Sequence, residues 1–167
     1  MQEIVLKGDE LMDKMVYTIA KAIEDYPDKY YFVECPLKHE FTPGIYSRQI
    51  TMPENKIIVS EKHLTEHMFV VLKGVVSVWI EGEGWEILSE GHKGITKAGT
   101  QRVLITATET IWATFHANPK GFTTADEIYN DIVEIKDNKF LNGRFKNNVF
   151  IPTTNEVEAS NFNKINQ

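Results

Sequence analysis

Short β-prone segments separated by turns make up most of the central part of the chain. Glycine-rich turns such as 81–84 and 97–99 follow several of these segments. Closely spaced short strands favour an antiparallel sandwich or barrel, because parallel strands need long crossover connections. The protein is therefore predicted to be mainly all-β, with one antiparallel β-barrel. The predicted strands are 30–33, 45–52, 56–63, 67–72, 75–81, 85–88, 94–96, 102–106 and 111–116.

The two ends of the chain have different patterns. Residues 9–25 carry apolar side chains at helical spacing and are followed by Pro27, so they are predicted to form an N-terminal amphipathic helix. A capping box from Thr124 to Glu127 predicts a short C-terminal helix. From Lys136 the chain is rich in asparagine with scattered phenylalanine, a composition that suits an extended arm. The predicted parts are 1–32 (helix and lead-in strand), 33–118 (barrel) and 119–167 (helix and arm).

Composition narrows the classes of partner. Acidic residues outnumber basic ones by 24 to 18, for a net charge of −6, and no basic cluster stands out. We therefore expect no nucleic-acid partner. No apolar run approaches the roughly 20 residues that cross a bilayer, and the first residues lack the pattern of a signal peptide. With a single cysteine, Cys35, which fits a reducing compartment, we expect an intracellular protein that is neither secreted nor bound to a membrane.

Histidines and glutamates cluster in residues 56–74, where His63 and His67 alternate with Glu61 and Glu66. Strand alternation over 56–63 puts Ile57, Val59, Glu61 and His63 on one face. Because the first two are core-like, Glu61 and His63 are expected to point inward. On one straight strand His63 and His67 would stand about 13 Å apart, so they can share a ligand only if the chain turns at 64–66.

Residues 61–74 and 94–102 resemble the two sequence motifs of the cupin superfamily. These proteins are small jelly-roll barrels that usually hold a divalent metal in the barrel mouth. Aligned on Gly74, the resemblance places His67 at the family's glutamate and His63 at its second histidine. Glu61 falls at the first histidine, and Arg102 replaces the histidine of the second motif. The resemblance implies a cupin-type antiparallel jelly roll in which the metal pattern is only partly kept.

A third metal ligand is available in His116. If the chain forms a hairpin at 108–110, His116 lies across from Arg102. His63 and His67, with His116 or with Glu61, would then form a three-ligand face for iron, manganese, zinc or nickel. Arg102 pointing inward would favour a small anionic ligand, or an ion pair with Glu61, and no cofactor. Glu61 and Glu66 are further candidate ligand-binding residues, and without a metal the histidines would be structural groups.

A closer likeness extends over residues 33–118. Runs such as VECPLKHEFTPGIYSR and KHLTEHMFVVLKGVVSVWIEG are similar to small cupin-like proteins encoded by tailed bacteriophages. This likeness implies a location in the cytoplasm of the host cell or in the virion. The aromatic arm is expected to mediate homo-oligomer or larger phage assembly contacts.

Three functions follow from these features. The first is a barrel that binds a divalent metal or a small anionic ligand, with no reaction assigned. The second is a non-enzymatic structural or assembly protein of a phage, for which the barrel is a scaffold. The third is a metal-dependent isomerase, epimerase or oxygenase. The sequence does not decide whether the protein is an enzyme.

Overall fold

A computed structural model describes residues 8–29, 35–134, 137–138, 143–146 and 149–152 of the chain. Residues 35–134 form one compact unit, and the described residues before and after this range belong to the other. The predicted strand 30–33 lies outside the described residues. The unit 35–134 extends beyond the predicted barrel boundary at Asn118 and includes the second helix.

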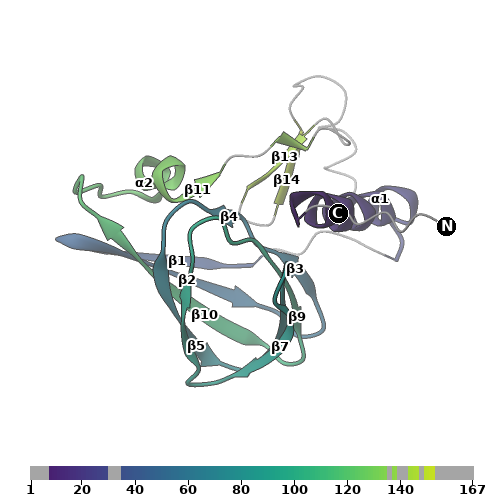
Figure 1. Ribbon diagram of the computed structural model, residues 1–167, viewed down its shortest axis with the longest axis horizontal. Helices are drawn as coiled ribbons and strands as arrows, with labels where there is room; N and C mark the ends of the chain where they lie inside the picture. Colours follow the sequence, from purple (N-terminus) through teal and green to yellow (C-terminus); the bar gives the residue numbers. More distant parts are fainter. Residues whose placement is uncertain (1–7, 30–34, 135–136, 139–142, 147–148, 153–167) are drawn as a thin grey trace. The chain divides into compact units, whose positions relative to one another are not determined.

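The compact unit 35–134 is built on two antiparallel sheets that face each other (Figure 1). In spatial order, the first sheet contains β1 (Leu37–Thr42), β2 (Gly44–Met52), β10 (Thr110–Asn118), β5 (His67–Lys73) and β8 (Lys93–Thr96). The second contains β3 (Ile57–Val59), β9 (Arg102–Thr106), β6 (Val75–Ile80) and β7 (Gly84–Ser89). All of these pairings are antiparallel, as predicted.

The pairing of the strands is nested in the order of a jelly roll. β2 pairs with β10, β3 with β9, β5 with β8, and β6 with β7, so that each pair lies inside the previous one along the sequence. Such nesting is the double Greek key that defines the jelly roll. The chain therefore passes repeatedly from one sheet to the other, which brings residues distant in sequence to the same end of the barrel.

The barrel interior is filled by the inward-facing side chains of both sheets. Along β5, His67, Phe69 and Val71 are buried while Met68 and Leu72 are exposed, which is the alternation expected of a strand with one core face. The Phe69 ring stacks on Trp112 of β10 with centroids 4.3 Å apart. Gly94 of β8 lies against the same Phe69 ring, and a Cβ atom at this position would meet it at 2.6 Å. The aromatic pair thus occupies space that a larger residue at position 94 would take.

Helix α2 (Ala125–Ile132) belongs to the same compact unit and carries the predicted capping box between Thr124 and Glu127. It is followed by β11 (Val133–Glu134), which pairs with β4 (Lys62–His63). The buried side chains of this segment form a second apolar cluster with Tyr46 of β2. In Figure 1 α2 and β11 lie at the end of the barrel where β4 is found.

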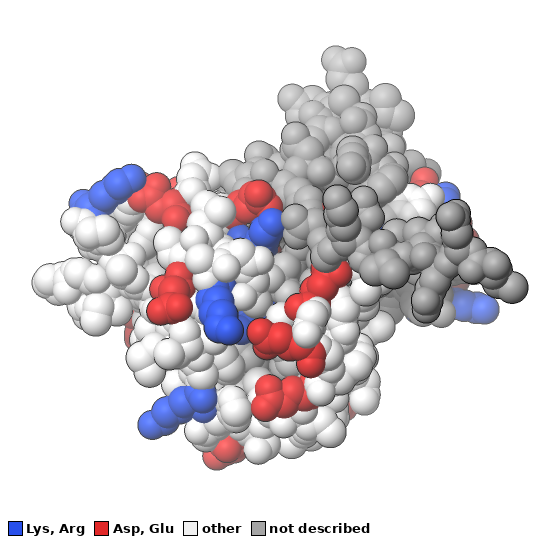
Figure 2. Space-filling model, viewed as in Figure 1, with Lys and Arg blue, Asp and Glu red and all other residues white. Residues whose placement is uncertain are grey.

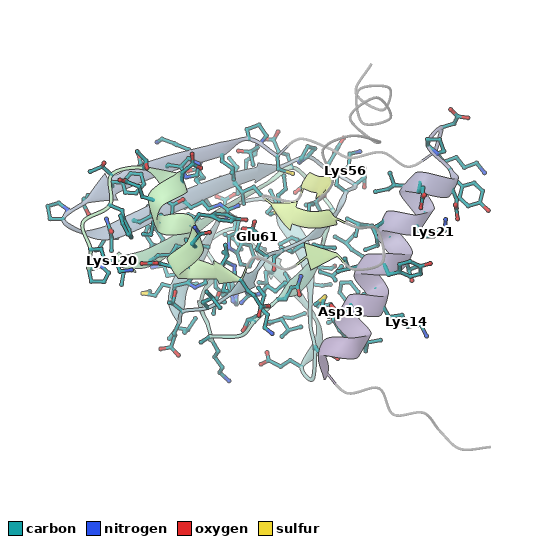
Figure 3. All side chains as sticks on the ribbon, turned by 90° about the horizontal axis from the view of Figure 1, so that it is seen from above. Asp13, Lys14, Lys21, Lys56, Glu61 and Lys120 are labelled. Carbon is teal, nitrogen blue, oxygen red and sulfur yellow. The ribbon has the colours of Figure 1, made fainter. Side chains whose placement is uncertain are left out.

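Helix α1 (Gly8–Asp25) is close to the predicted range 9–25 and has a buried apolar face. Lys21 pairs with Glu24 and Asp25 near the helix end, at 3.2 and 2.8 Å. Figure 3 shows Lys14 and Lys21 on this helix. Neither helix of the described residues is long and apolar enough to cross a membrane. The buried residues of α1 are Met12, Val16, Ala20 and Ile23.

The described part of the predicted arm contains a small antiparallel sheet. Its strands are β12 (Asp137–Asn138), β13 (Gly143–Lys146) and β14 (Val149–Pro152), in that order. The remaining residues of the arm lie outside the described ranges. Whether the arm mediates assembly stays a prediction.

Two local predictions were wrong. The stretch between Pro36 and Pro43 was not among the predicted strands but forms β1, because the prolines flank the strand and interrupt no ladder bond within it. The predicted strand 56–63 is two strands with different partners, since β3 pairs with β9 and β4 with β11. Consequently Ile58 faces the core and Ile57 is 59% exposed, the reverse of the predicted alternation.

Candidate metal centre

Three buried histidines from three strands meet at one end of the barrel. His63 lies on β4, His67 on β5 and His116 on β10. They are 8%, 5% and 1% exposed, and each offers one ring nitrogen within 4.8 Å of the nitrogens of the other two. Their ring centroids are 4.1 to 5.8 Å apart. Among the described residues, this is the only group of potential metal ligands.

The turn that brings His63 to His67 lies at residues 64–66, as the family resemblance implied. Lys62 and His63 pair with β11, whereas His67 begins the pairing of β5 with β8. The amide of Leu64 donates to the carbonyl of Ile132 at 2.9 Å, so the segment after α2 holds the start of the turn. Leu64, Thr65 and Glu66 are poor turn formers, and the fixed strands on both sides impose the change of direction.

His116 reaches the other two histidines by a different route from the one predicted. The expected hairpin between residues 102–106 and 111–116 does not form, because β9 belongs to the second sheet and β10 to the first. Arg102 pairs with Ile80, and His116 pairs with Tyr46. The residues between β9 and β10 cross from the second sheet to the first. His116 then lies near the other two histidines because its side chain points into the barrel.

Hydrogen bonds fix which nitrogen of two rings carries a proton. The Nδ1 of His67 lies 2.9 Å from the carbonyl oxygen of Thr65, so Nδ1–H donates and Nε2 keeps its lone pair. The Nε2 of His116 lies 2.9 Å from the Thr114 hydroxyl, whose own hydrogen points to the Arg48 carbonyl at 3.4 Å. The hydroxyl therefore accepts from Nε2–H, which leaves the lone pair on Nδ1. Such outer contacts commonly orient histidines for a metal.

Each histidine has one buried ring nitrogen with no hydrogen-bond partner. These atoms are Nδ1 of His63, Nε2 of His67 and Nδ1 of His116. A buried polar atom left without a partner costs about 1–3 kcal/mol. For His67 and His116 the unpartnered nitrogens are those that keep the lone pair. A metal ion accepting all three would remove this cost.

The spacing of the nitrogens fits a metal after a small adjustment. Two nitrogens that each lie about 2.1 Å from one ion are at most about 4.2 Å apart, and about 3.4 Å apart in a tetrahedral site. The observed limit is 4.8 Å. The nitrogens that lie farthest apart would therefore have to approach each other by up to about 1 Å for all three to bind one ion.

Burial keeps all three rings neutral. It is the main cause that lowers the pKa of His63 to about 2 and that of His116 to about 3. Burial also lowers the pKa of His67, and the nearby Arg102 charge acts in the same direction. Neutral imidazoles are the form that binds a metal, so the site is ready for a cation over a wide pH range.

Glu61 forms a buried ion pair with Arg48. Its Oε2 lies 3.1 Å from Nη1 of Arg48 on β2, with side chains 5% and 12% exposed. Figure 3 shows Glu61 in the middle of the barrel. It does not pair with Arg102, the partner considered from the sequence, because Arg48 reaches it from the neighbouring sheet. Arg48 was not identified as a functional residue from the sequence. It could have been found from its position, because Arg48 lies on the same strand face as Tyr46 and Met52, which both point inward.

Arg102 points into the barrel but does not contact a carboxylate of the described residues. Its guanidinium donates to the Thr96 hydroxyl at 3.0 Å and lies over the rings of Phe69 and Trp112 at 5.2 and 5.8 Å. Burial lowers the pKa of Arg102 to about 10, so it remains charged at neutral pH. The sequence was compatible with a metal beside an Arg102 turned away, or with an anion beside an inward Arg102. The structure combines converging histidines with an inward Arg102.

The remaining candidates lie apart from the three histidines. Glu66 is exposed in the turn and is not a member of the histidine group. Cys35 is buried in the apolar core. His39 lies on β1, with its Nδ1 2.7 Å from the Tyr46 hydroxyl. Tyr46 in turn stacks on His116 with centroids 5.7 Å apart, a contact that nothing in the sequence indicated.

Comparison with known proteins gives matches only among solved structures. No family model matches the chain, and no curated protein matches it in sequence. KdgF from Halomonas sp. is 14% identical over 54% of this chain and 89% of its own, with a TM-score of 0.44. A cupin superfamily protein from Desulfitobacterium hafniense is 6% identical over 50% of this chain and 77% of its own, also with a TM-score of 0.44. An RmlC-like cupin from Methanocaldococcus jannaschii is 11% identical over 52% and 84%, with a TM-score of 0.43.

The class of protein rests on the strand order. Nested antiparallel pairing over two facing sheets makes this chain a cupin-type jelly-roll barrel, with helices only outside the nested strands. The three histidines lie at one end of that barrel, with the buried ion pair of Glu61 beside them.

Proposed function

We propose that the protein binds a divalent transition metal through His63, His67 and His116. The supporting observation is the convergence of three buried ring nitrogens that lack any other partner. A buried, neutral imidazole is costly to leave unpaired and gains most from a metal. Nitrogen ligands favour iron, manganese, zinc or nickel over magnesium and calcium, which prefer oxygen.

Three protein ligands leave open coordination positions, as in many catalytic and ligand-binding metal sites. Bound there, a metal would supply Lewis acidity to whatever molecule occupies those positions. The surroundings favour a negatively charged occupant. The pKa values of His63 and His116 are lowered in part by Arg48, and that of His63 also by Arg102, so two cations act on the site. Of these two cations, Arg48 forms an ion pair with Glu61.

The test is metal content and affinity. Protein purified without chelator is analysed by mass spectrometry and then titrated with Zn²⁺, Mn²⁺, Ni²⁺ and Fe²⁺. We expect about one ion per chain for at least one of these metals, and a loss of at least tenfold in affinity in His67→Ala. His92→Ala is the matched control, because His92 is a barrel histidine outside the group. Equal affinity in wild type and His67→Ala, or no binding at all, would contradict the proposal.

Self-association in a phage assembly is a second candidate function, compatible with metal binding. An apolar row crosses the outer face of the first sheet, where Ile95, Met68 and Phe115 are neighbours in register. They are 62%, 54% and 41% exposed. Contiguous exposed apolar side chains favour an interface with another chain. Paired with the likeness to phage-encoded proteins, this row supports a homo-oligomer in the host cytoplasm or virion, with or without contacts from the arm.

Light scattering tests the second candidate. Met68→Lys places a charge in the middle of the row without touching the core, so the oligomer should dissociate while the fold remains. Lys93→Glu, on an exposed position of β8 outside the row, is the control. A wild-type monomer at all concentrations tested would contradict this candidate.

A further inference from the structure

A pocket opens between the two sheets on the side of the barrel away from β1. β7 and β8 are the edge strands there, one from each sheet, and they are not paired with each other in the described structure. The pocket has a volume of about 470 Å³, which is within the range of small-molecule sites. Residues of β5 to β9 line it, and those used below are Phe69, Glu83, Trp85, Glu86 and Arg102.

The buried wall of this pocket carries a cation, Arg102, that forms no ion pair with the described residues, although the charge of Glu83 at the rim acts on it. Arg102 is 5% exposed, and no carboxylate of the described residues lies within ion-pair distance of it. Its one side-chain hydrogen bond goes to a neutral hydroxyl, that of Thr96. A guanidinium has five N–H donors, so most of them remain available. Burying a charge without a counter-ion costs several kcal/mol, and an apolar residue of similar size would avoid that cost.

The exposed rim of the pocket has the opposite character. Glu83 and Glu86 line it and are exposed, and Trp85 between them is 53% exposed. Two carboxylates outnumber the single arginine, so a compact dianion such as phosphate would be repelled at the entrance. A molecule with a carboxylate at one end and an amine or hydroxyl at the other would satisfy Arg102 and the rim together. A flat apolar middle would pack against Phe69.

We propose that this pocket binds a small organic carboxylate, with the carboxylate on Arg102 and a hydrogen-bond donor of the ligand on Glu83 or Glu86. Arg102 is suited to the carboxylate because its planar fork allows two parallel hydrogen bonds. The two aromatic rings under the guanidinium hold its plane in place. This binding does not depend on a metal at the histidines, so it can be tested independently of the proposed metal site.

Three related probes test the chemistry of the pocket. They are 4-(aminomethyl)benzoate, 4-methylbenzoate without the amine, and 4-methylbenzylamine without the carboxylate. Binding to the full chain is measured by calorimetry and by ligand-observed NMR, with and without Zn²⁺. We expect the first probe to bind best, the second about tenfold more weakly, and the third not measurably. Inorganic phosphate should not compete with the first probe.

Two kinds of variant separate binding from folding. Arg102→Met keeps the length of the side chain and its packing on Phe69 and Trp112 but removes the charge. It should weaken the first probe at least tenfold and leave the melting temperature equal or higher, because an unpaired buried charge is lost. Glu83→Gln combined with Glu86→Gln, both exposed, should remove the preference for the amine-bearing probe and keep the affinity for 4-methylbenzoate.

The control is Lys120→Gln, which removes one positive charge from the Lys120–Asp131 pair near α2 (Figure 3) and should not alter probe binding. Equal binding in wild type and Arg102→Met would overturn the proposal, as would tight binding of phosphate in place of the carboxylates. A large fall in melting temperature in Arg102→Met would assign Arg102 a structural role and would also count against it. Binding of the first probe in metal-free protein would support the pocket even if the metal site fails its own test.

Discussion

Nη1 of Arg48 lies 3.1 Å from Oε2 of Glu61, and both side chains are almost completely buried. Arg48 comes from β2, and Glu61 precedes β4. The pair therefore joins the first sheet to the segment that carries His63. The Glu61 carboxylate, which the sequence motif placed among the possible metal ligands, is therefore engaged by Arg48. The candidate metal ligands are then the three histidines.

The first prediction distinguishes these two roles of Glu61. Glu61→Gln removes one charge of a buried pair and should lower the free energy of unfolding by about 3 kcal/mol. Metal stoichiometry should remain near that of the wild type, because the glutamate is not a ligand. Chemical denaturation and metal analysis give the two readouts. Loss of metal with unchanged stability would instead make Glu61 a ligand.

The second prediction concerns the pH dependence of stability in metal-free protein. His63 and His116 have folded pKa values of about 2 and 3, whereas unfolded histidine titrates near 6.5. Below about pH 6.5 the unfolded state binds more protons, so stability falls as pH decreases, and the loss levels off near the folded pKa values. Each of these two histidines should add a slope of about 1.4 kcal/mol per pH unit over that window.

Denaturation between pH 7.5 and 4.5 measures this slope, with His92→Ala as the control. His116→Asn, which retains a polar side chain but does not titrate, should reduce the slope. A slope that is unchanged in His116→Asn would show that other groups cause the acid sensitivity.

The third prediction is the pH at which a bound metal is released. A site of unperturbed histidines would lose its metal on mild acidification, near pH 6.5. Because burial lowers all three pKa values, proton competition is displaced to lower pH. We expect Zn²⁺ to remain bound at pH 6.0 and to be released only at more acid pH, together with unfolding. Equilibrium dialysis at several pH values, alongside circular dichroism, checks both events.

Much of the barrel could be predicted from local patterns. The strand at 102–106 agrees with β9, and those at 67–72 and 75–81 agree with β5 and β6 to within a residue. These segments are short runs of β-prone residues, and in β5 buried and more exposed side chains alternate from His67 to Leu72. Strand geometry gave only the condition that His63 and His67 could share a ligand if the chain turned at 64–66. The turn itself was implied by the family resemblance and not by the residues that form it.

What failed depends on partners that no local pattern reveals. The break after Val59 reverses the side-chain alternation, and its cause is pairing with two different strands, β9 and β11. The Ser60 hydroxyl accepts from the amide of Arg102 at 2.8 Å within this break. In the same way, the chain passes from the second sheet to the first between β9 and β10, so the hairpin assumed between them was wrong. Arg48 became relevant only through its distant partner Glu61.

On the face shown in Figure 2, lysine and arginine side chains are interspersed with aspartate and glutamate. This agrees with the composition, in which acidic residues are in excess. The charged features that carry the proposals lie inside the barrel. Their signal in the sequence is a charged residue at an inward position of a strand, as for Arg48 and Arg102.

The last prediction concerns Gly74, the residue on which residues 61–74 were aligned with the first cupin motif. It connects β5 to β6 with φ +91°, and a Cβ atom there would collide with the Glu109 backbone carbonyl and lie 2.8 Å from the Thr110 hydroxyl oxygen. Gly74→Ala should therefore combine backbone strain with a steric clash against the segment that crosses between the sheets. We expect a loss of at least about 3 kcal/mol in the free energy of unfolding.

Gly99→Ala is the matched control for this prediction. Gly99 has a similar φ of +85°, but a Cβ atom there would meet nothing within 4 Å, so only backbone strain of about 1 kcal/mol is expected. The difference between the two variants in urea denaturation isolates the clash at the crossing. Equal destabilisation would mean that glycine is needed at position 74 only for its backbone conformation, and that the crossing segment yields to make room for the added methyl group.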